Sequence, residues 1–179
     1  MNPTPRWADA LLAVIGRAER AVTFVAFLLM IGVVFADVVS REVTGTGLHW
    51  ARQAGVYANI FVVMVGIGLA SADGAHLRPR FADGWLPQAA EPVILRLKEF
   101  LMAAFCAGFA WVGFGVVAET FTLQERSAVL RTLVWPVQAV IPTVFCVAAL
   151  RHGLFALYPA LRPDEASGGA ALTGEQATD

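Results

Sequence analysis

The chain has 179 residues, of which 58% are hydrophobic and 15% charged, and its formal net charge is −1. An average soluble domain carries about 25% charged residues, so this composition indicates a membrane protein. A net charge so close to zero excludes the broad basic field that attracts nucleic acid. The length allows one four-helix domain but not a second domain.

Residues 1–20 form the first predicted segment, which is too polar to cross a membrane. Its apolar residues recur at helical spacing, and they are Trp7, Leu11, Val14, Ile15 and Ala18. This pattern is typical of a short amphipathic helix lying on the cytoplasmic surface of a membrane. The alternative is that the segment extends the first span.

Four apolar stretches without a charged residue come next, at residues 21–36, 53–72, 100–118 and 132–150. A helix rises about 1.5 Å per residue, so roughly 20 residues cross a hydrocarbon core about 30 Å thick. Every backbone amide in lipid must bond within its own segment, which makes each stretch a predicted helix. The predicted fold is all-α, a membrane domain over residues 21–158. Its four spans form two helical hairpins, at about 21–40, 53–72, 98–118 and 132–155.

Two prolines, Pro136 and Pro142, lie within the fourth stretch. A proline near the start of a helix is tolerated, but one in the middle removes a backbone hydrogen bond. We therefore expect a kink at Pro142. Beyond the fourth span, residues 159–179 lack apolar periodicity and are predicted to be a disordered tail.

The lysines and arginines are distributed unequally between the two sides of the membrane. Nine lie in the N-terminal segment, in the connection after the second span and beyond the fourth span, whereas four lie in the other two connections. Cytoplasmic segments carry the excess of Lys and Arg. Both termini are therefore predicted to be cytoplasmic.

The interiors of the four apolar stretches offer little chemistry. They contain no ionisable residue, and the most central polar group is Asn59, which we interpret as a hydrogen-bonding contact between helices. Cys106 and Cys146 form no CxxC pair and are predicted to be small buried hydrophobic residues. The histidines all lie at or beyond span ends, which argues against haem. We expect no catalytic, cofactor-binding or metal-binding residue, and no enzymatic activity.

Asp37 and Arg41 stand four residues apart at the end of the first span. This spacing brings two side chains together on a helix. The prediction is an ion pair that closes this end of the span. A carboxylate at the edge of a span is poorly placed to carry protons for a small drug exporter.

The residues between the spans resemble those of a known family. The first span ends in Asp37-Val38-Val39-Ser40-Arg41, Trp50 precedes the second span, and Gly74-Ala75-His76-Leu77-Arg78 comes after it. Residues 127–142, which include Trp135, lead into the fourth span in a similar way. Together these junctions resemble the DctQ-like family, the small membrane subunit of tripartite ATP-independent periplasmic (TRAP) transporters.

One junction departs from the family pattern. Relatives often carry Trp-x-Glu-Glu before the second span, whereas this chain has Trp50-Ala51-Arg52-Gln53. The charge there is inverted, so a contact made by those acids in relatives cannot take the same form here. The candidate partner-contact or membrane-anchor residues are Asp37, Arg41, Trp50, Arg52, His76, Arg78 and Trp135.

The resemblance implies a non-catalytic subunit in the inner membrane of a bacterium. Its implied partners are a large membrane subunit, which would bind Na+ and substrate, and a periplasmic binding protein that delivers a small organic acid for symport. The subunit would serve as a scaffold for the large subunit. The alternative is a stand-alone four-span assembly or regulatory protein without a role in transport.

Overall fold

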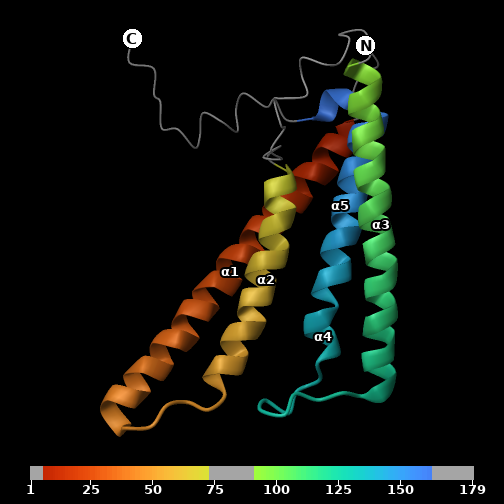
Figure 1. Ribbon diagram of the computed structural model, residues 1–179. Coiled ribbons are helices and arrows are strands. Elements are labelled where there is room, and N and C mark those ends of the chain that lie inside the picture. The colour runs from red at the N-terminus through yellow and green to blue at the C-terminus, as the bar shows by residue number, and fades with distance from the viewer. Residues whose placement is uncertain (1–5, 73–90, 163–179) are drawn as a thin grey trace, which may run out of the picture.

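The computed structural model describes residues 6–72 and 91–162, which are helical over most of their length (Figure 1). The helices are α1 (Arg6–Thr44), α2 (Ala51–Ala72), α3 (Glu91–Leu123), α4 (Trp135–Gln138) and α5 (Val140–Leu157), and a 3-10 turn, η3 (Pro159–Leu161), comes last. Four spans, formed by α1, α2, α3 and α4 together with α5, are long and apolar enough to cross a membrane. The predicted all-α membrane fold is confirmed. His76 and Arg78, and residues 163–179 of the predicted tail, lie outside the described residues.

The helices form two hairpins, α1 with α2 and α3 with α5 (Figure 1). We call the end where α1 begins and α5 ends the terminal end, and the end that carries residues 45–50 and 124–134 the loop end. The two hairpins meet near the terminal end and diverge toward the loop end. An apolar groove of about 690 Å³ lies between them, lined by α1, by α2 and by Leu130 and Thr132 of the connection at residues 124–134.

The first helix is much longer than a membrane span requires. Its 39 residues correspond to roughly 58 Å at 1.5 Å per residue. Residues 6–20 of the predicted amphipathic segment are helical, and α1 passes residue 20 without a break. They are therefore continuous with the helix of the first span, and their position on the membrane surface stays a prediction.

The fourth span is interrupted, although not at Pro142 itself. Pro142 has no amide hydrogen to donate to the carbonyl of Gln138, four residues earlier. The regular helix stops at that carbonyl, and Ala139 separates α4 from α5. Pro142 is buried against α3, where a Cβ added to Gly113 would lie 3.0 Å from the Pro142 Cβ. Glycine at residue 113 thus permits the close approach of α3 and α5.

Many apolar side chains of the spans, above all on α1 and α3, point away from the rest of the chain, with Phe35, Trp111 and Leu157 among the most exposed. Outward-facing apolar side chains suit a surrounding of lipid or of another membrane subunit. Cys106 is buried as predicted, but the prediction for Cys146 is wrong because this residue is exposed on α5. In a span, hydrophobicity does not reveal which face is buried, since lipid and protein interior are both apolar.

Candidate partner-contact sites

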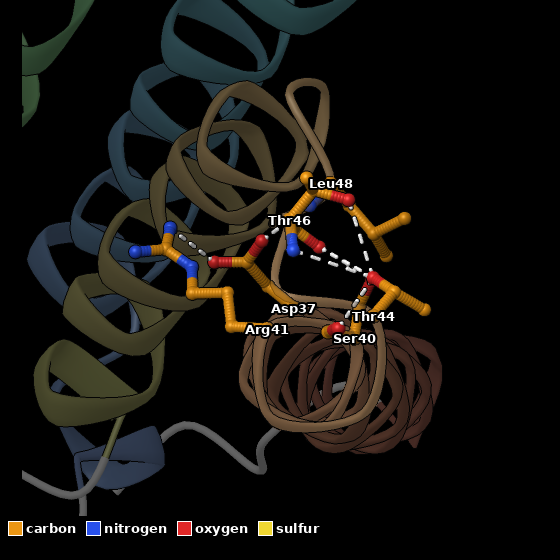
Figure 2. Close-up of polar contacts among 6 residues, drawn as sticks. All are labelled: Asp37, Ser40, Arg41, Thr44, Thr46 and Leu48. Atoms are coloured by element: carbon orange, nitrogen blue, oxygen red, sulfur yellow. Dashed lines mark hydrogen bonds and ion pairs between the residues drawn. The ribbon is translucent and has the colours of Figure 1, made fainter.

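The predicted ion pair at the end of α1 is present. Arg41 Nη2 lies 2.7 Å from Asp37 Oδ2, and the backbone amide of Leu48 donates a 2.7 Å hydrogen bond to Asp37 Oδ1. Figure 2 shows the Asp37 carboxylate between these two donors. Asp37 therefore holds both its own helix end and the chain that leads to α2. The second of these contacts spans 11 residues and was not predicted.

The chain reverses sharply after α1 because two glycines allow it. Gly45 has φ +72°, and its amide donates a hydrogen bond to the carbonyl of Arg41, which ends the helix in the left-handed conformation that glycine favours. Gly47 lies directly over the ion pair. A Cβ at Gly47 would stand 2.6 Å from Arg41 Nε and 2.8 Å from Asp37 Oδ1. A side chain at residue 47 would therefore displace the ion pair.

Small polar side chains complete the turn at the end of α1. Ser40 Oγ donates to the carbonyl of Thr46 at 2.9 Å, and Thr44 Oγ1 donates to the carbonyl of Ser40 at 2.7 Å (Figure 2). The first bond joins the chain beyond the helix to its last turns, and the second lies within those turns. The connection of residues 45–50 is thus fixed against α1.

A depression of about 340 Å³ lies beside this turn, on the surface of the first hairpin. We call it the notch, and its lining residues are Met30, Val34, Asp37, Arg41, Ala51, Arg52, Gly55, Val56 and Asn59. The residues of α1 and α2 that line the groove between the hairpins are different ones, including Leu29, Val33, Ala54 and Ala58. The notch and the groove therefore lie on different faces of the first hairpin.

Arg52 occupies the first turn of α2, is exposed, and has no acidic residue beside it in that turn. The amide groups at the start of a helix carry a partial positive charge, so this position favours an anion. Within the notch, Arg41 is already paired with Asp37. Among residues 6–72 and 91–162, Arg52 therefore has no ion-pair partner, and it stands at a position that disfavours a cation.

Asn59 lies two turns further along α2, in the span itself. Its side chain is exposed, and within residues 6–72 and 91–162 its amide has no hydrogen-bond partner. Among the described residues, Asn59 therefore does not form the predicted hydrogen bond between helices. An amide at this depth faces lipid or another subunit.

The two tryptophans among the predicted site residues have different surroundings. Trp50 is partly exposed at the start of α2. Trp135 is half-buried at the start of α4, where its ring meets Phe121 edge-on with 5.5 Å between centroids. The indole nitrogen of Trp135 is buried without a hydrogen-bond partner among the described residues. Trp135 thus packs within the chain, and its role in partner contact stays a prediction.

A second polar site, which was not predicted from the sequence, lies at the terminal end. The Arg151 side chain of α5 is 2% exposed, and its Nη2 lies 2.6 Å from Glu19 Oε2 of α1. Its other terminal nitrogen donates to the carbonyl of Gly68 in α2. We call Glu19, Gly68 and Arg151 the clamp, because one guanidinium joins α5 to both helices of the other hairpin. A Cβ at Gly68 would lie 2.6 Å from Glu19 Oε1, so a side chain there would displace the Glu19 carboxylate.

A second buried pair lies next to the clamp and joins the helices of the second hairpin. His152 Nδ1 lies 2.6 Å from Glu99 Oε2, and Arg162 Nε lies 3.8 Å from Glu99 Oε1. Arg162 also donates a 3.0 Å hydrogen bond to the carbonyl of Leu95 in α3. These contacts attach the end of α5 and the chain beyond it to the start of α3.

One signal in the sequence pointed to these residues. Glu99 and Arg151 each border a charge-free stretch directly, and Glu19 and His152 stand one residue further out. In an up-and-down bundle, the starts of the first and third spans and the end of the fourth share one end of the molecule. Opposite charges at those positions therefore come together. In the part of the chain that the structure describes, no three His, Cys, Asp or Glu residues group as metal ligands would.

The comparison with protein families agrees with this geometry. Residues 30–161 match the family model described as tripartite ATP-independent periplasmic transporters, DctQ component. The chain belongs to the DctQ family. The match covers more than half of the chain, including the notch and Arg151 but not Glu19. No curated protein matches the chain.

Proposed function

We propose that this DctQ protein is the non-catalytic small membrane subunit of a TRAP-type secondary transporter. It holds the large membrane subunit in a bacterial inner membrane, with both termini in the cytoplasm. A periplasmic binding protein delivers a small organic acid to the large subunit, which binds Na+ and substrate and couples their uptake. The family match supports the class of transporter component.

The observation that carries the proposal is the placement of charge. Arg151 pairs with Glu19 and His152 with Glu99 at the terminal end, whereas Asp37 pairs with Arg41 near the loop end. Ion-coupled transporters bind substrate and ions near the middle of the membrane, commonly with charged side chains or unwound helices that point inward. The charge-free stretches of this chain supply no such charges. Its buried ion pairs join helices to one another instead.

The test is co-purification and transport with the partners encoded beside the gene. A tagged large subunit should retain this chain in detergent, and uptake into liposomes should require both membrane subunits together with the binding protein. A large subunit that transports at the same rate without this chain, and does not retain it, would favour a stand-alone assembly or regulatory role instead.

A further inference from the structure

We propose that the notch receives a membrane helix of the large subunit, which presents a carboxylate to Arg52 and a hydrogen-bonding side chain to Asn59. This inference rests on the proposed function and assigns the contact to one face of the molecule. The face is the side of the α1–α2 hairpin that does not line the groove toward α4 and α5.

The charge of the notch selects an acidic partner. Asp37 and Arg41 neutralise each other at 2.7 Å, so the charge of Arg52 remains. An anion placed beside Arg52 would also face the amide groups of the first turn of α2, which favour negative charge. Arginine binds carboxylates through two parallel hydrogen bonds. A carboxylate on the partner therefore satisfies both the side chain and the helix end.

Asn59 indicates that the partner reaches well below the membrane surface. Lipid chains offer no hydrogen bond to its amide, and polar side chains in spans are commonly satisfied by a neighbouring helix. A lipid headgroup supplies an anion near Arg52 but nothing at the depth of Asn59. A helix that descends along the notch supplies both groups.

The spacing of the two groups defines what to look for in the partner. Arg52 and Asn59 are seven residues apart on α2, which is about two helical turns or roughly 10 Å. A partner helix that runs nearly parallel or antiparallel to α2 should carry its carboxylate and its polar side chain about six to eight positions apart. Gly55 and Val56 between them leave room for apolar side chains of that helix.

The first test compares binding with the stability of the isolated subunit. Asn59→Leu should weaken binding of the purified large subunit in lipid nanodiscs about fivefold, the effect of losing a hydrogen bond of about 1 kcal/mol between spans. The same change removes an unsatisfied amide, so the isolated chain should unfold at the same temperature or higher. Asn59→Gln, which keeps the amide, should recover part of the affinity.

Reversal of the charge at Arg52 is the second test. Arg52→Glu should weaken binding at least tenfold, and a matching change of the partner's carboxylate residue to Lys should restore part of the loss. Arg131→Glu is the matched control, because Arg131 is an exposed arginine in the other connection at the loop end. It should leave binding within twofold of the wild-type value.

Cross-linking locates the partner directly. A photo-reactive maleimide attached to Asn59→Cys should link this chain to the large subunit, whereas the same probe on Ala58→Cys, which lines the opposite groove, should not. These cysteines are placed in a Cys106→Ala, Cys146→Ala background.

Different failures have different meanings. If wild-type chain does not bind the large subunit at all, the proposed function is wrong. If it binds and the Asn59→Leu and Arg52→Glu variants bind equally well, the notch is not the contact surface. A third outcome is that Arg52→Glu weakens binding only in anionic lipid and Asn59→Leu leaves binding unchanged. That outcome would show a lipid headgroup in the notch and overturn the proposal.

Discussion

At the scale of single residues, Arg151 shows how a span end can bury a full charge. Its guanidinium is enclosed by a carboxylate from α1 and a carbonyl from α2, so its charge is compensated where water is excluded. Removing one member of a buried pair leaves the other as an uncompensated charge. The two members are therefore expected to depend strongly on each other.

Arg151→Met should lower the free energy of unfolding by about 3–5 kcal/mol, because Glu19 then stays buried without a partner. Glu19→Leu combined with Arg151→Met should recover most of this loss. Arg17→Ala is the control, since Arg17 is exposed near the same end of α1, and it should change stability by no more than about 0.5 kcal/mol. Unfolding of the purified chain by SDS titration measures all three. Equal effects of the Arg151 and Arg17 variants would contradict the burial argument.

Asp37 should contribute more to the stability of the chain than Arg41 does. The Arg41 side chain is 62% exposed, and an exposed pair contributes about 0–1 kcal/mol. Asp37 is only 17% exposed and also accepts the Leu48 amide, a bond to a charged group of about 1.5–3 kcal/mol. Asp37→Ala should therefore lower the melting temperature in detergent more than Arg41→Ala does. The reverse order would mean that the turn is held by its threonines and glycines alone.

Gly47→Ala tests the close packing over this pair. The added methyl group would overlap Arg41 Nε and Asp37 Oδ1, so the ion pair must open and the melting temperature should fall. Gly108→Ala is a matched control within α3, where no atom lies within 4 Å of an added Cβ. That change should be neutral or stabilise the helix by up to about 1 kcal/mol. Similar behaviour of the two variants would contradict the geometry at residue 47.

At the scale of the elements, sequence patterns predicted the features that depend on local spacing. The four spans are set by charge-free length, and the Asp37–Arg41 pair is set by a separation of four residues on one helix. The contact between Glu19 and Arg151 joins residues 132 positions apart, so it depends on how the hairpins dock. The exposure of Asn59 was not predictable either, because apolar residues surround it on every face of α2. How the two hairpins dock and which way a side chain faces both depend on tertiary packing. In lipid, local sequence patterns do not determine that packing.

The orientation of α1 remains a prediction that labelling can check. In a chain without its native cysteines, Val43→Cys, at a residue 77% exposed near the loop end, should react with a membrane-impermeant maleimide added outside spheroplasts. Ala10→Cys, exposed at the start of the same helix, should react only after the membrane is opened. The excess of Lys and Arg on the side of the termini is the reason for this expectation. Labelling in the opposite order would invert the topology.

At the scale of the whole molecule, the chain is a pair of hairpins with polar contacts at their ends and apolar surfaces between. We expect the purified subunit in liposomes to show no uptake of organic acid under a Na+ gradient, because its charge-free spans offer no charged side chain to bind the ion or the substrate. The complete transporter in parallel liposomes is the positive control. Uptake by the single chain would contradict the scaffold proposal.

The two hairpins are joined by the clamp at the terminal end and diverge toward the loop end (Figure 1). Over a hydrocarbon layer about 30 Å thick, a rotation of about 5° around the clamp would displace the loop end of one hairpin by roughly 2.6 Å. Between the hairpins lies an apolar volume of about 690 Å³ that hydrocarbon or a neighbouring side chain must occupy. We therefore expect the angle between the hairpins to depend on what fills that volume and to differ between lipids and between assemblies.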